Sequence, residues 1–399
     1  MRAVKLSELA ASKRWAINGG PFGSKLVSKD YRDEGVPVIR GTNLPDGSWF
    51  SDDNLVFVSE EKADELLANN AHPGDVIFTQ RGTLGQVGLI PLDSPFERYV
   101  ISQSQMKMTV DRSIADPRWL YYYFRQESIV EAIKARAVTS GVPHINLGTL
   151  KDLEIALPDL ETQKATADCL TALDRQLENH RKQISMLEEA ARLIYTEFFV
   201  RQTLTHSTTA EPATLAEAVW INPKTPCETG KEASFVPMTA LSQTGMVIEG
   251  VEQRAVGGGA KFQNGDTLLA RITPCLENGK TGFVQFLDDE NPIASGSTEF
   301  IVLRSRRVNP CWVYCLARSD HFREFAVRSM SGADGRQRVS TDSLAQYPVT
   351  IPPTETLEHF EQAASPMFKQ IHTLTLRIAE LKKARDLLLP RLISGQLRL

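Results

Sequence analysis

Four short patterns occur twice in this 399-residue chain, in the same order, with the second copy 191 to 194 residues after the first. Repetition at a nearly fixed offset indicates an internal duplication, so both halves are expected to adopt the same architecture. The pairs are Gly74–Asp75 with Gly265–Asp266, Asp116–Tyr121 with Asn309–Tyr314, Ser140–Gly141 with Ser331–Gly332, and Leu157–Glu161 with Ile351–Glu355.

Each half begins with a segment rich in Gly, Pro, Asn and β-branched residues, which predicts short strands separated by turns. The expected strands are residues 36–39, 75–78 and 87–90 in the first half and 235–238, 267–270 and 299–303 in the second. A helix then follows a proline in each half, because proline is favoured in the first helical turn. These helices are expected from Trp119 to about Lys134 and from Trp312 to about Arg328.

The composition of the sequence changes from about Leu160 to Phe199. This stretch has neither Gly nor Pro, and its apolar residues recur every three or four positions. This spacing predicts a long helix with one apolar seam. A matching stripe lies 194 residues later, and Pro390 is expected to end that second helix. The predicted seam comprises Leu170, Leu173, Leu177, His180, Ile184, Leu187, Ala191, Ile194 and Phe198, with Ala364, Met367, Ile371, Leu374, Ile378, Leu381, Arg385, Leu388 and Leu392 in the second copy.

An apolar seam must be buried, and its own copy is the favoured partner. The two helices would then run antiparallel and place the globular segments at opposite ends; packing on its own domain, or a homodimer, are the alternatives. The polar seam residues His180 and Arg385 are hypothesised to fix the register. The prediction is an α+β fold with an internal pseudo-two-fold repeat: mixed α/β domains at 1–158 and 202–352, and long antiparallel coiled-coil helices at 159–201 and 353–399.

Charge and cysteine content narrow the class of protein further. The net charge of −4 leaves no strongly basic segment, so any contact with DNA phosphates depends on local loops or on partners. Five scattered cysteines argue against a disulfide framework. Cys311 and Cys315 are expected to be buried thiols, and neither a metal nor a cofactor is predicted. The charged first residues do not resemble a signal peptide, and no stretch is apolar enough for a membrane, which predicts a cytoplasmic protein.

The order of globular segment, long helix, globular segment and long helix resembles the specificity subunit of Type I restriction–modification systems. Individual motifs are similar to that family as well. They are Gly19–Leu26, Asp30–Tyr31, Gly35–Leu44, Gly74–Thr83, Ile101–Gln105, Ile145–Leu147, Leu157–Pro158, Glu161–Gln163, Leu187–Val200 and Leu389–Gly395. The resemblance covers nearly the whole chain and is weaker over 215–330.

The resemblance implies a non-catalytic protein that binds double-stranded DNA. Residues 1–158 and 202–352 would be target-recognition domains, each reading one half of an asymmetric, split sequence. The central conserved helix at 159–201 and the C-terminal conserved helix at 353–399 would set the spacing between the half-sites. Their outer faces would dock two adenine methyltransferase subunits, and restriction and translocase subunits would join that core.

Residues suited to DNA contacts lie in polar loops that contain or adjoin glycine. Arg pairs with guanine and Asn or Gln with adenine, while Lys, Ser and Thr suit phosphates. The triplet Arg336–Arg338 is the strongest candidate, since two arginines flank an amide in a Gly-rich loop. The full set is Lys25, Arg40, Asn43, Thr79, Gln80, Arg81, Thr83, Ser102, Gln103, Ser104, His144, Arg271, Thr273, Lys280, Arg336, Gln337 and Arg338. The alternative for each is an ordinary surface loop.

Two other classes of protein remain as alternatives. A DNA methyltransferase would need an Asn-Pro-Pro-aromatic or Asp-Pro-Pro-aromatic motif, which neither Asn222–Thr225 nor Asn291–Ala294 supplies. Gly257–Gly259 precedes no predicted helix and does not form a phosphate-binding loop. A two-headed coiled-coil adaptor for other proteins fits the heptads equally well, and a related methylation-based defence system could use the same kind of subunit.

Overall fold

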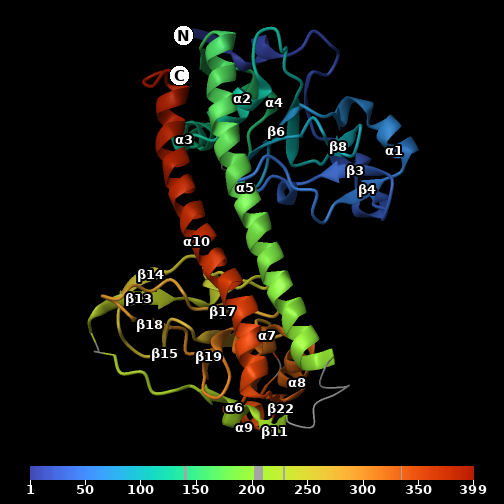
Figure 1. The fold of residues 1–399 in the computed structure, drawn as a ribbon. Helices are drawn as coiled ribbons and strands as arrows, with labels where there is room; N and C mark the ends of the chain where they lie inside the picture. Colours follow the sequence, from blue (N-terminus) through green and yellow to red (C-terminus); the bar gives the residue numbers. More distant parts are fainter. Residues whose placement is uncertain (139–141, 202–209, 228–229, 334) are drawn as a thin grey trace. The chain divides into compact units, whose positions relative to one another are not determined.

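The computed structural model describes residues 1–138, 142–201, 210–227, 230–333 and 335–399 (Figure 1). Ser140–Gly141 and the start of the predicted domain at residue 202 lie outside these residues. The chain forms two compact units, and each long helix contributes to both of them. Unit 1 comprises Met1–Asn179 and Glu380–Leu399, and unit 2 comprises His180–Ala379.

Unit 1 contains two four-stranded sheets with the strand orders β4-β3-β8-β5 and β2-β9-β6-β7, plus a small β1-β10 pair. Its strands are β1 (Arg2–Lys5), β2 (Ile17–Gly19), β3 (Val36–Ile39), β4 (Val56–Val58), β5 (Asn70–Ala71), β6 (Val76–Thr79), β7 (Val87–Leu89), β8 (Tyr99–Ile101), β9 (Gln105–Met108) and β10 (Glu154–Leu157). Its short helices are α1 (Glu60–Glu65), α2 (Pro117–Phe124), α3 (Glu127–Ala135) and α4 (Leu147–Lys151).

Unit 2 repeats this topology, with the strand orders β14-β13-β18-β15 and β12-β19-β16-β17 and a β11-β22 pair. Its strands are β11 (Glu211–Thr214), β12 (Val219–Ile221), β13 (Glu232–Val236), β14 (Glu252–Ala255), β15 (Ala260–Gln263), β16 (Thr267–Ala270), β17 (Thr281–Phe283), β18 (Ile293–Gly296), β19 (Phe300–Ser305), β20 (Met330–Ser331), β21 (Arg338–Val339) and β22 (Pro348–Ile351). Its short helices are α6 (Leu215–Ala218), α7 (Pro310–Arg318), α8 (Asp320–Arg328) and α9 (Thr341–Ala345). In both units the middle strands of one sheet, β3 with β8 and β13 with β18, pair in parallel. The internal repeat is therefore confirmed.

The sequence predicts one helix after each proline. This prediction is wrong in one respect, because each of these segments forms two short helices. In the second half the break falls at Ser319, whose hydroxyl accepts a hydrogen bond from the Phe322 amide and caps α8. A capping serine supplies the acceptor that the first turn of a new helix lacks, which favours a restart at this position. In the first half the break falls at Arg125–Gln126.

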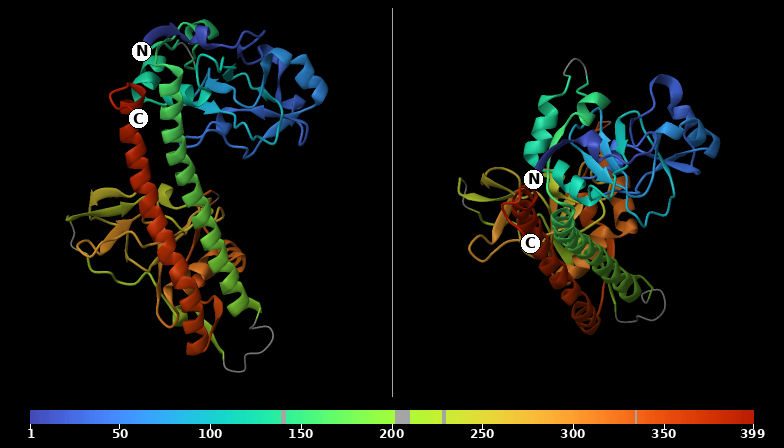
Figure 2. Two further views of the ribbon diagram at one scale, coloured as in Figure 1. Left: turned by 45° about the horizontal axis from the view of Figure 1, so that its top comes forward. Right: turned by 90° about the horizontal axis from the view of Figure 1, so that it is seen from above.

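The two long helices are α5 (Leu160–Thr196), which continues as a π-helical turn at Glu197–Arg201, and α10 (Thr354–Ile393). They pack together within each unit (Figure 1; Figure 2). In unit 1, Arg385 near the end of α10 donates to Asp174 in the first half of α5 at 3.1 Å. In unit 2, Phe360 near the start of α10 stacks on Tyr195 near the end of α5, with ring centroids 6.1 Å apart. The helices are therefore antiparallel.

The prediction that Pro390 ends α10 is wrong, because the helix continues to Ile393. A proline within a helix removes one backbone hydrogen bond. Here the carbonyl that loses its donor lies in an exposed part of the helix, and packing holds the turns around the proline. Leu392 and Ile393 are buried in the core of unit 1. The helix ends before Gly395, whose φ of +70° suits a residue without a side chain.

The predicted seam residues are all buried or half-buried. Leu170, Leu177, Ile371, Leu374 and Ile378 are at most 6% exposed. The remaining apolar members of the stripe are likewise covered or partly covered. The imidazole of His180 is half-buried, and its Nδ1 has no hydrogen-bond partner among the described residues. None of the described helices combines the length and apolar character that a bilayer-spanning segment requires.

A buried polar contact joins the two long helices in unit 1. The Asp174 carboxylate accepts hydrogen bonds from the Tyr122 hydroxyl at 2.8 Å and from the Arg385 guanidinium at 3.1 Å. The side chains of Asp174 and Arg385 are only 9% and 13% exposed. The charge of Arg385, the polar residue in the seam of α10, is thus neutralised by a carboxylate on α5.

We expect Asp174→Ala to destabilise the protein by about 2 to 3 kcal/mol, because it leaves a largely buried guanidinium without its buried counterion and the Tyr122 hydroxyl without its acceptor. The measurement is urea unfolding followed by circular dichroism. Asp386→Ala is the matched control: it removes the exposed carboxylate that also contacts Arg385, so its effect should stay below about 0.5 kcal/mol. Equal effects of the two substitutions would contradict a structural role for the buried pair.

Candidate nucleic-acid interface

Three loops of unit 1 meet at one edge of the β2-β9-β6-β7 sheet. The first follows β6, the second joins β8 to β9, and the third precedes α4. The Gln80 amide donates to the Ser104 carbonyl at 2.7 Å, and the Gly82 amide donates to the Pro143 carbonyl at 3.3 Å. Arg81 and His144 form an isolated antiparallel bridge. Backbone hydrogen bonds therefore gather residues that are up to 64 positions apart in the sequence.

Several predicted contact residues lie together on these loops. Arg81, Thr83 and Gln103 are exposed, and Gln80, Ser102, Ser104 and His144 are half-buried. The Gln103 amide donates to the carbonyls of Gly23 and Leu26 at 2.6 and 3.0 Å, which holds the turn with the exposed Lys25 beside them. The edge thus offers cations, amides and hydroxyls, which are the groups that contact DNA.

Other predicted contact residues of unit 1 have local partners. Asn43 is fully buried: its side-chain oxygen accepts from the Arg40 amide, and its nitrogen donates to the carbonyls of Ser51 and Asp53. Thr79 is 3% exposed, and the Arg40 guanidinium donates to the Asn54 carbonyl. Asn43 and Thr79 therefore support the loops from beneath and present no free surface in this conformation.

Unit 2 builds the same edge from equivalent loops. The Arg271 amide, which follows β16, donates to the Glu299 carbonyl between β18 and β19 at 3.0 Å. The Thr273 amide donates to the Gln337 carbonyl at 3.1 Å, and Ile272 bridges Arg338. These contacts correspond to those of Gln80 and Arg81 in unit 1.

A charged cluster distinguishes the edge of unit 2. The Arg338 guanidinium donates to both Glu299 carboxylate oxygens, at 2.7 to 3.0 Å, and Arg271 donates to the same carboxylate at 3.2 Å. The hydrogen bonds from Arg338 hold the pKa of Glu299 below its usual range; partial burial opposes this and Arg271 adds to it. From the sequence, Glu299 is predicted only as the first residue of the strand at 299–303. The available signal was its position in the repeat, beside the loop equivalent to Ser102–Ser104.

The remaining predicted residues of unit 2 differ in exposure. Arg336 is exposed, and Gln337 and Thr273 are half-buried. The Lys280 amine donates to the Met238 carbonyl at 2.9 Å, so this lysine braces a neighbouring loop.

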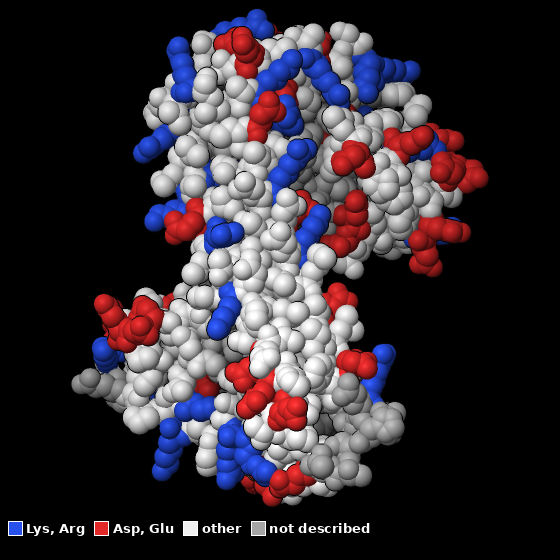
Figure 3. All heavy atoms as spheres, viewed as in Figure 1, with Lys and Arg blue, Asp and Glu red and all other residues white. Residues whose placement is uncertain are grey.

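Two adjoining hollows of about 650 and 520 Å³ lie beside this edge and share Thr298 in their linings. Lys224, Lys261 and Arg271 line the first, and Arg254 lines the second. Lys224, Lys261 and Arg254 are not among the predicted contact residues, because Lys261 and Arg254 lie within strands β15 and β14 and Lys224 has no other cation near it in the sequence. On the face shown in Figure 3, charges of both signs are interspersed, in keeping with the small net charge.

Comparisons with known proteins agree with this architecture. Residues 4–189 match the family described as the Type I restriction modification DNA specificity domain. The chain is 23% identical to the Type I restriction enzyme MjaIX specificity subunit of Methanocaldococcus jannaschii, over 96% of this chain and 91% of that protein. It is 33% identical to the EcoEI specificity subunit of Escherichia coli, over 35% of this chain and 24% of that protein. The crystal structure of an S subunit from M. genitalium has the same fold, with a TM-score of 0.60 over 98% of this chain and 95% of the other, at 16% identity.

Residues 4–189 thus carry a Type I restriction–modification DNA specificity domain, and over nearly its whole length the chain is similar to the specificity subunits of such systems. Such subunits are non-catalytic and recognise the DNA target within the complex. The loop edges of the two units are thus candidate surfaces for recognition, and not active sites.

The depressed pKa of Glu299 generates a prediction about pH. Its ionised carboxylate stabilises unit 2 above the ordinary glutamate pKa of about 4.3, and this contribution is lost as the pH falls below that value. We expect the stability difference between the wild type and Glu299→Gln to be largest near about pH 6 and to shrink toward about pH 3, measured by urea unfolding. Glu324→Gln removes an exposed ion pair with Arg328 and should show little difference at either pH. A Glu299→Gln difference that stays constant with pH would contradict the charged cluster.

Proposed function

We propose that each unit reads one half of a bipartite, asymmetric sequence in double-stranded DNA. The observation that carries this proposal is the repeated edge: the same three loops converge in both units and expose polar and cationic side chains. A duplicated reading surface with different side chains suits two different half-sites. Arg81 bridges His144 in unit 1, whereas the equivalent bridge of unit 2 joins Ile272 to Arg338, so the matching loops carry their arginine on opposite sides.

The chemistry of the loops supports direct reading of bases. Arginine recognises guanine through two hydrogen bonds, and glutamine recognises adenine in the same way. Gln80 and Arg81 provide such groups in unit 1, and Arg336 and Gln337 provide them in unit 2, whereas the Gln103 amide already donates to the carbonyls of Gly23 and Leu26. Glu299 holds Arg271 and Arg338 in a fixed orientation, so less conformational entropy is lost when either contacts DNA. Lys224, Lys261 and Arg254 are suited to phosphates.

The long helices are proposed to set the spacing between the half-sites and to dock two adenine methyltransferase subunits, through which restriction and translocase subunits join. Large apolar side chains on these helices support a docking role. Met186 and Leu193 on α5 are 69% and 63% exposed, and Leu376 and Leu387 on α10 are 55% and 56% exposed. Exposed apolar residues of this size are typical of surfaces that a partner covers.

The first test is a comparison of N6-methyladenine across the host genome with the gene intact and deleted. We expect the deletion to abolish methylation at one bipartite motif with a fixed unspecified gap, because no other subunit would supply the sequence reading. Unchanged methylation, in cells shown to express the partner methyltransferase, would favour the protein-interaction adaptor instead.

Single substitutions then test the division between the units. We expect Arg81→Ala to weaken discrimination in one half of the motif and Arg338→Ala in the other, each by about 1 to 3 kcal/mol of binding free energy. The measurement is competition binding of the assembled methyltransferase complex to duplexes with single-base changes. Arg2→Ala and Arg306→Ala remove exposed arginines of β1 and of the segment after β19, outside these loops, and serve as controls. If both loop variants affected the same half, the assignment of one half-site to each unit would fail.

A further inference from the structure

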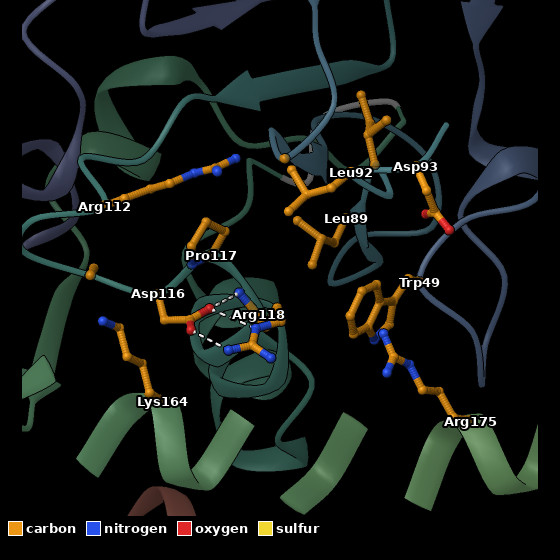
Figure 4. A pocket seen from close by; sticks show the side chains of 13 residues that line it. Trp49, Leu89, Leu92, Asp93, Arg112, Asp116, Pro117, Arg118, Lys164 and Arg175 are labelled. Atoms are coloured by element: carbon orange, nitrogen blue, oxygen red, sulfur yellow. Dashed lines mark hydrogen bonds and ion pairs between the residues drawn. The ribbon is translucent and has the colours of Figure 1, made fainter. Parts of the chain in front are cut away.

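A hollow of about 610 Å³ lies in unit 1 beside the first half of α5 (Figure 4). Its apolar surface is formed by Trp49, Leu89, Leu92 and Pro117. Leu92 is 68% exposed, which is unusual for a large apolar side chain within a concave surface. The hollow therefore presents apolar area that nothing in unit 1 covers.

Cations from separate elements surround this apolar surface, together with the carboxylate of Asp93 beside Leu92. Arg112 comes from the segment before α2, and Lys164 and Arg175 come from α5 (Figure 4). Over the described residues, none of these three has a hydrogen-bond or ion-pair partner. Arg118 differs, because it is neutralised by Asp116 at 2.7 Å and by Asp168 at 2.6 Å. Arg112 lies against Gly74, where a Cβ would stand 2.2 Å from the guanidinium, so a residue without a side chain makes room for this cation.

The hollow is at the opposite end of the sheet from the DNA-reading loops. Gly74 lies two residues before β6, and Gln80 directly follows it, so the strand runs from the hollow to the loop edge. Leu89 ends the antiparallel neighbour β7 and returns the chain to the hollow. The cations of the hollow thus form a site separate from the loop edge.

The charge of the hollow is only partly repeated in unit 2: at the offset that aligns the two helix seams, Arg175 corresponds to Lys369, which keeps the charge. At the offset that aligns the two helix seams, Lys164 corresponds to Glu358, which reverses the charge. At the offset that aligns the two prolines, Arg118 corresponds to the buried Cys311. An occupant that needs Lys164 as well as Arg175 finds both cations in unit 1 only.

We propose that this hollow binds an acidic segment of a partner protein that inserts one large apolar side chain. The apolar side chain would cover Leu89 and Leu92 beside Trp49, and flanking carboxylates would pair with Arg112, Lys164 and Arg175. An apolar centre with a charged rim is the usual anatomy of a protein interface. A nucleic acid fits less well, because two leucines and a single indole offer no series of aromatic faces for successive bases.

The test uses the full chain and a fluorescein-labelled nonapeptide of aspartate and glutamate around a central Leu-Phe pair, followed by fluorescence anisotropy. We expect the wild type to bind this peptide, and the double variant Arg112→Glu with Arg175→Glu to bind at least tenfold more weakly. Replacing Leu-Phe by Ser-Ser in the peptide should weaken binding at least fivefold, because the apolar anchor is lost. Arg181→Glu, an exposed arginine on α5 outside the hollow, should change binding less than twofold.

Labelled single-stranded and duplex oligonucleotides form the competing arm of the experiment. Binding of either that depends on Arg112 and Arg175, without binding of the peptide, would overturn the proposal in favour of a nucleic-acid site. Peptide binding that survives the double charge reversal, or no peptide binding at all, would also overturn it. The variant Leu92→Ser keeps the result interpretable if charge reversal disturbs folding, since it alters only an exposed side chain and should weaken peptide binding alone.

Discussion

The packing of the two long helices against each other is the contact on which both units depend, because neither core is complete without both helices. In unit 1 the buried core contains Leu170 from α5 together with Leu392 and Ile393 from α10. In unit 2 it contains Tyr195 from α5 together with Phe360 from α10. Each core therefore joins a sheet-bearing segment to helical segments distant in sequence. The loop edges stand on sheets that these cores fix, so their side chains gain a defined orientation from contacts far from the loops.

Duplication creates a problem of specificity, since similar helical segments could dock in the wrong unit. The buried polar contacts of the two units differ in a way that opposes this exchange. In unit 1, Asp174 accepts from Tyr122 and Arg385. In unit 2, Glu188 accepts from the Tyr314 hydroxyl at 2.5 Å and from the Met246 amide at 2.8 Å. An exchanged helix would bury a carboxylate without its donors, and an unpaired buried charge is costly. The seams can thus share one apolar pattern while the polar positions select the correct partner.

The sequence predicts much of this fold, because the repeat and the helical periodicity are strong, local signals. The strands at 36–39 and 267–270 and the two long helices follow directly from them. The breaks at Arg125–Gln126 and Ser319 do not. A single capping hydroxyl favours the restart at Ser319, and no side-chain cap marks the restart at Gln126. The sequence predicts which loops form the candidate site, but not which residues of those loops are placed to contact DNA. Asn43 is a residue type that suits a DNA contact, yet its side-chain amide is hydrogen-bonded to the backbone beneath the loop. Glu299 is recognisable only once three distant loops converge on it.

The small net charge of −4 constrains how such a protein can hold DNA. Affinity from phosphate neutralisation scales with the number of cations that contact the backbone, and each loop edge offers few. In unit 2, Arg271 and Arg338 already share the carboxylate of Glu299, so three charged groups contribute one net positive charge. This cluster adds little to the sequence-independent attraction between the protein and DNA phosphates. It contributes mainly by fixing the orientation of the hydrogen-bond donors of the two arginines. Because base reading depends on orientation whereas general affinity depends on charge, the chain is suited to selecting a sequence while the other proteins of the complex supply most of the attraction to the duplex.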